Sequence, residues 1–397
     1  MKTPVSIITV SQLHRFECLL NLYELIKLQK YKNITEWVIV EGSRSKEDGE
    51  KNKEYINALL QIHSEDFEFF KIQIIYVEYT GLSLSDLRNL GNNKCSGDII
   101  VCMDDDDYYP PERISHAVET LRKSSYLIAG CSGLYMYEYF MGKLYKFSRF
   151  HKNHSTNNCM AFKREYLLNH KHAEGLTMAE ESSFTNDFTE PMVQLNPLKC
   201  IIASSHSINT YNKRELCVMG SIGMHPCLNE ANCHITDYIP SERFTKMKNI
   251  FYKEEESPYD IVYFCGGFGN KWNPIDIEGS DLVELCECQA SNGKKVAVYA
   301  NIFENVTYNN VDYKKWNLFE FNHEFNTVVL WGSYGLICGL PYNIKSRNII
   351  VDIYEDDFTN QEYMFKVYKK YENKITKTVF KHNNHKEEFY KILITKK

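Results

Sequence analysis

The sequence predicts an α/β protein with a mainly parallel sheet, followed by a second, smaller α/β domain. Short β-branched and apolar runs alternate with amphipathic stretches through the first quarter of the chain, which is the pattern of consecutive βαβ units. A charged stretch ends this alternation, and the same alternation restarts beyond it. A chain of 397 residues is long enough for two domains of this kind.

We expect the first domain to span residues 1–241. Its strands are expected at 5–10, 36–40, 72–77 and 99–103, and its first helices at 16–30 and 83–94. Right-handed crossovers make successive strands of this kind parallel. The carboxyl ends of the strands therefore meet at one edge of the sheet, where ligands bind in open α/β folds.

The second domain is expected at residues 259–397. Residues 242–258 are charged and end in Glu-Glu-Glu-Ser-Pro, which predicts a linker or a connecting helix. Buried strands are then expected at 261–265, 296–300, 327–331 and 348–353. This half of the chain is therefore expected to form its own sheet.

Composition excludes several classes of protein. A formal net charge of −6 argues against a nucleic-acid binder, which needs clustered Lys and Arg. The N-terminus reads as a strand, and no apolar run is long enough to cross a bilayer, so a soluble, cytoplasmic protein is expected. The thirteen scattered cysteines are expected to be reduced thiols. Cys217, Cys227, Cys233 and His234 are a weak alternative as a zinc site, because no close pair of ligands occurs.

Four consecutive aspartates, Asp104 to Asp107, follow the apolar run 99–103 and precede Tyr-Tyr-Pro-Pro-Glu-Arg. Two carboxylates at the end of a buried strand, together with diphosphate oxygens, are suitable ligands for Mg²⁺ or Mn²⁺. The run therefore predicts a site for a metal and a diphosphate. A solvated acidic turn is the alternative, while the spacing does not fit an EF-hand.

Polar residues at other strand ends extend this site. Thr9 and Val10 end the first strand, and Glu41 ends the second, where its carboxylate is either a ligand for a base or ribose group or a turn residue. Arg88 lies in the segment 81–89 before the aspartate strand. Its guanidinium either reaches a diphosphate or holds the acidic cluster in place.

Two further features point to proton transfer and ligand binding. Glu180 and Glu181 are adjacent carboxylates, and a paired carboxylate suits a general base for an acceptor hydroxyl. The alternative is an acidic pair at a helix N-terminus. His206 is either a metal or phosphate ligand or a structural histidine.

These motifs, in this order, resemble family 2 glycosyltransferases of GT-A fold over about residues 4–215. The resemblance implies a nucleotide-sugar donor, commonly a UDP-sugar, a glycan or glycoconjugate acceptor, and Mn²⁺ or Mg²⁺ as cofactor. It implies an inverting, in-line displacement in which the metal and Arg88 offset the charge on the departing nucleoside diphosphate.

The resemblance also assigns roles to individual residues. Glu41 matches the residue that contacts the donor base, where the family usually has Asp. Asp104 and Asp106 match the DxD pair, and the second member of the Glu180–Glu181 pair matches the expected base. The residues assigned to the donor are Thr9, Val10, Glu41, Arg88, Asp104 and Asp105, those assigned to the metal are Asp106, Asp104 and His206, and those assigned to catalysis are Glu181 and Glu180.

The C-terminal part has a separate likeness. The runs 262–268, 272–274, 278–281 and 292–299 are similar to the opening, Rossmann-like half of GT-B glycosyltransferases of family 4 type. The relatives usually have Gly-Gly-Ser-Glu where this chain has Glu-Gly-Ser-Asp at 278–281. The half that normally grips the nucleotide is not present, which implies either a fragment of a longer chain or a half-domain for binding or stability.

Two other functions remain open at this point. A nucleotidyltransferase of the same fold would need a glycine-rich loop with Arg and Lys after the first strand, and residues 9–14 do not supply one. A non-catalytic carbohydrate-binding or scaffold protein is favoured if Glu181 lies far from the metal site.

Overall fold

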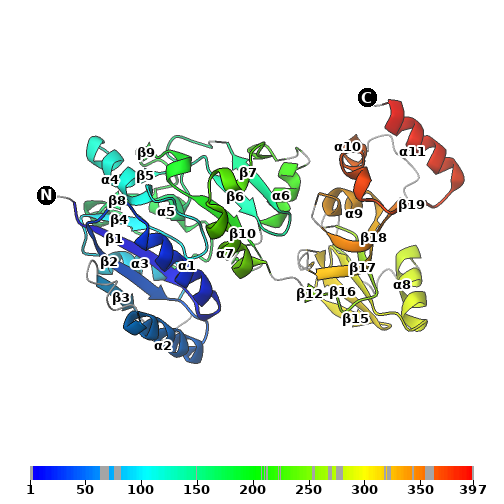
Figure 1. Cartoon of the computed structure of the whole chain (residues 1–397), viewed down its shortest axis with the longest axis horizontal. Helices are drawn as coiled ribbons and strands as arrows, with labels where there is room; N and C mark the ends of the chain where they lie inside the picture. The colour runs from blue at the N-terminus through cyan, green and yellow to red at the C-terminus, as the bar shows by residue number, and fades with distance from the viewer. Residues whose placement is uncertain are drawn as a thin grey trace. The chain divides into compact units, whose positions relative to one another are not determined.

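The structure is a computed structural model that describes two compact units. The described residues are 3–62, 71–75, 82–148, 150–206, 208–209, 211, 213–221, 223, 225–252, 255–266, 271–273, 280–316, 319, 323–341, 344–353 and 362–395. The first unit comprises Met1–Tyr137, Leu144–Tyr211 and Glu230–Phe251, and the second comprises Glu138–Lys143, Asn212–Asn229 and Tyr252–Lys397. Each unit is described separately below (Figure 1).

The first unit is built on a seven-stranded sheet with the order β3-β2-β1-β4-β8-β5-β9. The pairs β3–β2, β2–β1 and β1–β4 are parallel, whereas β8 is antiparallel to both β4 and β5. The strands of this sheet are β1 Val5–Ser11, β2 Ile34–Glu41, β3 Lys71–Ile75, β4 Ile99–Cys102, β5 Ile128–Gly130, β8 Ala161–Lys163 and β9 Met192–Gln194. The predicted α/β architecture is therefore confirmed.

Helices and a smaller sheet complete this part of the chain. A four-stranded sheet has the order β10-β6-β7-β11. Its strands are β6 Tyr135–Glu138, β7 Lys143–Phe147, β10 Ile202–Ser205 and β11 Leu228–Glu230. The α-helices up to residue 251 are α1 Phe16–Lys27, α2 Lys46–Ile62, α3 Leu84–Lys94, α4 Arg113–Lys123, α5 Glu180–Phe184, α6 Arg214–Ser221 and α7 Ser241–Phe251.

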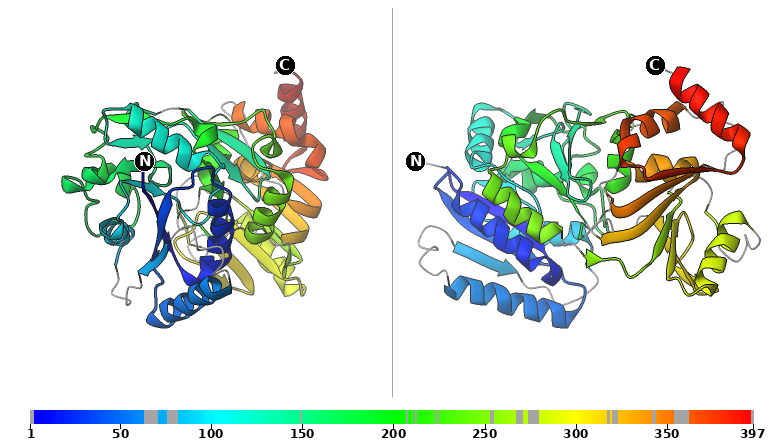
Figure 2. Two further views of the ribbon diagram at one scale, coloured as in Figure 1. Left: turned by 60° about the vertical axis from the view of Figure 1, so that its left-hand side comes forward. Right: turned by 45° about the vertical axis from the view of Figure 1, so that its right-hand side comes forward.

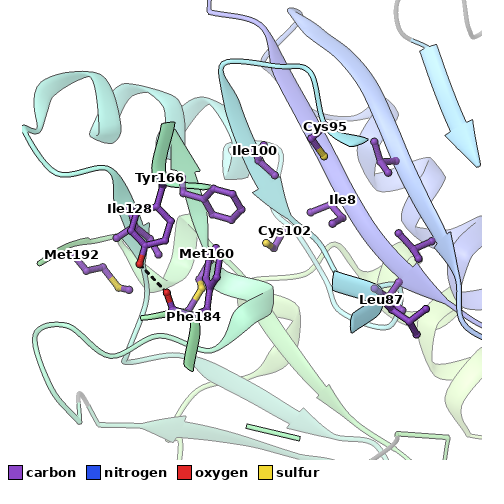
Figure 3. Packing of buried hydrophobic residues seen from close by; sticks show 14 residues of the cluster. Ile8, Leu87, Cys95, Ile100, Cys102, Ile128, Met160, Tyr166, Phe184 and Met192 are labelled. Carbon is purple, nitrogen blue, oxygen red and sulfur yellow. Dashed lines mark hydrogen bonds between the residues drawn. The ribbon is translucent and has the colours of Figure 1, made fainter. Parts of the chain in front are cut away.

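The core of the first unit follows from the alternation of side chains along its strands. One face of the sheet carries the even-numbered residues of β1, β2 and β4. Among them, Ile8, Val38 and Ile100 are each at most 3% exposed. These side chains join Tyr166 and Phe184 in one cluster (Figure 3). The odd-numbered residues are buried as well, which is typical of a parallel sheet covered on both faces.

Helix α3 packs directly on this sheet, and helix α7 packs on α1. A Cβ on Gly91 of α3 would lie 2.5 Å from Ile8 Cδ1, so only glycine lets this helix approach the sheet so closely. Helix α7, whose residues overlap the stretch expected as a linker or connecting helix, lies alongside α1 in both views of Figure 2. Arg243 of α7 donates a hydrogen bond to Asn21 Oδ1 of α1 at 3.3 Å.

Helix α1 ends at Lys27, three residues earlier than the pattern predicts. Gln29 is buried, and its side-chain amide donates to Leu25 O and Pro110 O and accepts from the Ile114 N–H. These hydrogen bonds compete with continuation of the helix. A local pattern cannot reveal a stop that depends on a partner about eighty residues away.

The second unit has a sheet with the order β15-β16-β14-β13-β17-β18-β19, and β12 also pairs with β17. All neighbouring pairs from β16 to β19 are parallel. Numbered along the chain, these six strands run 3-2-1-4-5-6, the order of doubly wound nucleotide-binding folds. The strands are β12 Glu255–Glu256, β13 Ile261–Phe264, β14 Val296–Ala300, β15 Val306–Tyr308, β16 Val311–Lys315, β17 His323–Trp331, β18 Lys345–Ile353 and β19 Lys377–Phe380.

The helices of the second unit after residue 252 are α8 Asp281–Ser291, α9 Gly332–Gly339, α10 Glu362–Tyr371 and α11 Asn383–Thr395. Helix α9 packs very closely on the sheet, because a Cβ on Gly335 would lie 2.2 Å from Phe264 O. In the described part of the chain, no helix combines the length and apolar character needed to cross a membrane. Residues 267–270 and 274–279, which carry part of the GT-B likeness, lie outside the described residues.

Candidate active site

The aspartate run begins where β4 leaves the sheet. The Met103 N–H donates to Ile8 O at 3.1 Å, and the Thr9 hydroxyl donates to Met103 O at 2.7 Å. These bonds hold Met103, the first residue after β4, against β1. The Asp104 N–H then donates to the hydroxyl of Tyr109 at 2.7 Å, so the chain turns at Asp104.

Asp107 is a structural residue of this turn. Its carboxylate accepts hydrogen bonds from the Asn158 amide at 2.6 Å and from the Ser204 N–H at 2.8 Å. Both partners come from segments distant in sequence, so Asp107 fastens the turn to β10 and to the segment before β8. Three of the four aspartates, Asp105, Asp106 and Asp107, are at most 6% exposed, which contradicts the alternative of a solvated acidic turn.

Arg15 is the cation that neutralises the middle of the run. Its guanidinium forms an ion pair with Asp105 at 3.2 Å and a second, closer one with Asp106. The Ser11 hydroxyl also donates to Asp105 at 2.8 Å. Burial nevertheless raises the pKa of Asp105 to about 7, against the opposing effect of Arg15, and the like charge of Asp106 adds to this.

Asp106 has two further partners on the segment after β10. Asn209 donates to Asp106 Oδ2 at 2.8 Å, and His206 Nε2 lies 3.3 Å from the same oxygen. The His206 ring stacks on Phe251 of α7 with ring centroids 4.0 Å apart. The structure thus places His206 between Asp106 and α7, and its role as a metal ligand stays a prediction.

Arg88 joins the two acidic motifs. Its Nη1 lies 3.1 Å from Asp104 Oδ1, and its Nε donates to Glu180 Oε1 at 2.6 Å. Arg88 and Glu180 are both buried. Of the two roles considered for Arg88, holding the acidic cluster in place is the one that these contacts support.

The two glutamates have opposite pKa shifts. Burial would raise the pKa of Glu180, but the charge of Arg88 outweighs it, so this pKa lies below its ordinary value. Burial raises the pKa of Glu181 to about 7, and the neighbouring charge of Glu180 adds to the increase. Adjacent carboxylates with separated pKa values are typical of acid–base sites.

The backbone at this pair is unusual. Ala179, which precedes helix α5, has φ +54°, a conformation that is uncommon for a residue with a side chain. The loop before it is anchored by Asn89 of α3, whose side chain exchanges two hydrogen bonds with the His172 backbone at 2.8 and 2.9 Å. The His172 ring lies 3.0 Å from Glu180 O, and burial lowers its pKa to about 4, so it is neutral.

The remaining predicted residues lie at the ends of β1 and β2. Glu41 is buried and accepts hydrogen bonds from the Ser43 N–H at 2.6 Å and from Asn52, and burial raises its pKa. Thr9 is fully buried and also accepts from Trp37 Nε1 at 3.0 Å. Val10 belongs to the hydrophobic core. The donor-binding roles of these three residues stay predictions.

The donor atoms of the site suit a hard divalent cation. Asp104, Asp106 and His206 offer carboxylate oxygens and an imidazole nitrogen, which Mn²⁺ and Mg²⁺ accept in proteins. Guanidinium groups nevertheless hold both carboxylates here. Among the residues that the structure describes, no three His, Cys, Asp or Glu side chains are gathered as a metal-binding group, and this includes the zinc alternative at Cys217, Cys227, Cys233 and His234.

Sequence reasoning missed several residues of the site. Arg15 is the most important, because it contacts two of the four aspartates. A signal was available, since Arg15 follows the first strand by only four residues, and basic groups at strand ends suit phosphate ligands. The sequence does not point to Asn158 or Asn209. These neutral amides are far from the aspartates along the chain, and only the fold brings them within hydrogen-bond distance of Asp107 and Asp106.

Residues 6–172 match the protein family described as Glycosyl transferase family 2. The match covers β1, β2, β4, the aspartate run and Arg88. The chain therefore contains a glycosyltransferase domain, and this domain carries the first of the two acidic motifs. The Glu180–Glu181 pair lies just beyond the matched segment. No curated protein matches the chain by sequence.

Several solved structures are similar to part of the chain. S. aureus TarS 1-349 in complex with UDP-GlcNAc is 14% identical, with 54% of this chain and 63% of that chain covered and a TM-score of 0.38. The mannosyltransferase PcManGT from Pyrobaculum calidifontis in complex with GDP-Man and Mn²⁺ is 12% identical, with 55% and 61% covered and a TM-score of 0.40. The similarity spans about three fifths of the length of these proteins.

Proposed function

We propose that the first unit is a metal-dependent, inverting glycosyltransferase. It would move a sugar from a nucleotide-sugar, of which a UDP-sugar is the first candidate, to a hydroxyl of a glycan or glycoconjugate. The observation that carries this proposal is the Arg88 bridge. It joins Asp104, at the end of a strand in the family 2 segment, to the glutamate pair that supplies a base.

Glu181 is the proposed general base. A pKa of about 7 makes its carboxylate a stronger base than an ordinary glutamate while leaving much of it ionised near neutral pH. Glu181 takes the proton of the acceptor hydroxyl, and the acceptor oxygen forms a bond to the anomeric carbon. The bond from that carbon to the diphosphate oxygen breaks, and the nucleoside diphosphate leaves with the electron pair. One displacement of this kind inverts the anomeric centre.

Glu180 and Arg88 are proposed as positioning residues. Their hydrogen bond fixes the start of helix α5 relative to Asp104, and it keeps Glu180 ionised beside Glu181. The negative charge of Glu180 in turn raises the pKa of the base. The site thus divides two adjacent carboxylates between a structural and a chemical role.

Asp106 and Asp104, with His206 beside Asp106, would hold Mn²⁺ or Mg²⁺. When bound, the ion supplies positive charge that stabilises the departing diphosphate. Glu41 at the end of β2 is proposed to contact the donor base, and Thr9, Val10 and Asp105 to shape the same donor site.

Domain roles follow from this assignment. We propose residues 1–241 as the catalytic domain, 242–258 as its connection, and 259–397 as a Rossmann-like domain with a binding or stabilising role. The strand order of the second sheet supports the last part, because ligands of such sheets bind where the strand order reverses. That point lies between β13 and β17.

A donor-hydrolysis assay tests the proposal. The full chain is incubated with a panel of nucleotide-sugars in Mn²⁺ or in EDTA, and free nucleoside diphosphate is measured. We expect slow release with one donor, dependent on the metal, because water replaces the acceptor. Absence of both hydrolysis and metal-dependent nucleotide binding across the panel would leave a non-catalytic carbohydrate-binding or scaffold role.

A further inference from the structure

The Arg15 guanidinium contacts Asp106, which is a proposed metal ligand. It ends the short 3₁₀ segment Leu13–Arg15 directly after β1, and its side chain is only 12% exposed. One nitrogen of its guanidinium pairs with Asp105 at 3.2 Å, and the other pairs with Asp106 Oδ2. A single side chain therefore neutralises both of these buried carboxylates.

Asp106 Oδ2 is already crowded. Arg15, Asn209 and His206 all contact this one oxygen. A carboxylate oxygen has two lone-pair directions, so a cation that coordinates Oδ2 must displace part of this set. Asn209 contributes a neutral amide, whereas Arg15 carries a full positive charge that opposes a second cation in the same place.

The departing guanidinium needs a new partner, because a buried, unpaired charge is costly. A diphosphate offers one, since guanidinium groups bind phosphate oxygens in the same bidentate manner as carboxylates. The acidic side chains whose charges raise the pKa of Arg15 are Asp106, Asp105 and, more weakly, Asp104. The nucleotide is thus the natural acceptor for the released side chain.

We propose that Arg15 couples metal binding to nucleotide binding by exchanging partners, and we call this exchange the Arg15 latch. Without nucleotide, Arg15 pairs with Asp105 and Asp106 and weakens metal binding at Asp106. With a nucleoside diphosphate present, Arg15 moves to the phosphates and frees Asp106 for the metal. This inference rests on the proposed function, because it needs a diphosphate and a metal at the same site.

The latch makes a thermodynamic prediction. Two ligands that share one displaced group must increase each other's affinity by the same factor. Direct contact between metal and diphosphate also produces such coupling, so coupling in the natural chain is not sufficient evidence. The distinguishing feature is the metal affinity in the absence of nucleotide, which Arg15 alone lowers.

The experiment measures Mn²⁺ affinity by electron paramagnetic resonance, with and without saturating UDP. The variants are Arg15→Gln, which removes the charge, and Arg15→Lys, which keeps it. Arg122→Gln is the matched control, because Arg122 is an exposed arginine on helix α4 of the same unit. Thermal unfolding of each variant checks that the fold is retained.

We expect Arg15→Gln to bind Mn²⁺ at least fivefold more tightly than the natural chain when UDP is absent, and to bind UDP more weakly when Mn²⁺ is present. The factor by which UDP strengthens Mn²⁺ binding should fall at least fivefold. Arg15→Lys should keep the weak Mn²⁺ binding of the natural chain without UDP, and Arg122→Gln should resemble the natural chain throughout.

Two results would overturn the latch alone. Equal Mn²⁺ affinities of Arg15→Gln and Arg122→Gln without UDP would show that Arg15 does not compete with the metal. Weaker Mn²⁺ binding by a folded Arg15→Gln, with and without UDP, would mean that Arg15 only orders the aspartates. If the natural chain binds neither Mn²⁺ nor UDP, the latch and the proposed function fall together.

Discussion

The two large sheets of the molecule share a construction but differ at their strand ends. In both, parallel strands are buried, and glycine lets a helix pack closely on the sheet, Gly91 in the first and Gly335 in the second. Strand β4 of the first sheet runs into four aspartates, three of which are paired with two arginines. In the second sheet, β13 runs into Cys265-Gly266, and β17 ends at Trp331 and is followed by Gly332.

This difference shows that the parallel sheet only positions side chains at its strand ends, and that the identity of those side chains decides the function. The charged groups of the first sheet cost free energy to bury, and each needs a partner from another segment. At the described strand ends of the second sheet, Phe264 of β13 and Ala300 of β14 are apolar and fully buried. Function in this chain is therefore assigned from the charged cluster, and the fold serves as its support.

The strongest test of the comparison is Glu181→Gln. Loss of the base should lower turnover by about 10²- to 10⁴-fold, the usual contribution of general base catalysis, whereas nucleotide affinity should change little. Turnover is measured as product formation and affinity by calorimetry with UDP and Mn²⁺. Glu165→Gln, an exposed glutamate in the same unit, is the control. Normal turnover in Glu181→Gln would show that the base is another group.

A second test separates two aspartates of the same run. Asp106→Asn should weaken metal-dependent nucleotide binding of the folded protein at least tenfold, because Asp106 is a proposed metal ligand. Asp107→Asn should lower the free energy of unfolding by about 1–3 kcal/mol, because its carboxylate accepts two buried hydrogen bonds. Thermal unfolding and UDP titration of both variants provide the measurement. Identical behaviour of the two variants would contradict the division into a ligand and a structural residue.

The order of strands was largely predictable, whereas short elements were not. Apolar β-branched runs located β1, β2, β4, β13 and β14 because each is buried on both faces. The strands between residues 128 and 230 are three to five residues long, and this length carries too little periodicity to be recognised. The early end of α1 at Lys27 depends on Gln29 reaching Pro110, a contact that only the fold creates.

The site was predictable where charge is concentrated in sequence. The aspartate run, Arg88 and the glutamate pair stand out as clusters, and the structure brings all of them together. The partners of the cluster were harder to find. Asn158, Asn209 and Phe251 are ordinary residues whose importance depends on distances to Asp107, Asp106 and His206.

A pH profile sharpens the assignment of the base. With a pKa of about 7, Glu181 is protonated in acid, so kcat/KM should fall about tenfold for each pH unit below 7 and level off above it. The contribution of Glu181 to the free energy of unfolding changes with pH in the opposite direction to its contribution to kcat/KM. Because folding raises this pKa from 4.5, the stabilisation from protonated Glu181 is complete below pH 4.5 and is lost as the pH rises through 7. A profile in Glu181→Gln that keeps the same inflection would assign it to another group.

The smallest expected effect on the site comes from the second sheet. Gly335→Ala places a Cβ within 2.2 Å of Phe264 O, so α9 must shift, and overpacking of this kind costs about 1–3 kcal/mol of stability. The core of this sheet and the core behind the aspartates are separate clusters. UDP affinity in Mn²⁺ should therefore change less than twofold, while the thermal transition of the second unit falls. Ser291→Ala, exposed on α8, is the control. A large loss of UDP affinity in folded Gly335→Ala would mean that the second sheet takes part in nucleotide binding. That result would contradict the division into a functional first sheet and a supporting second sheet.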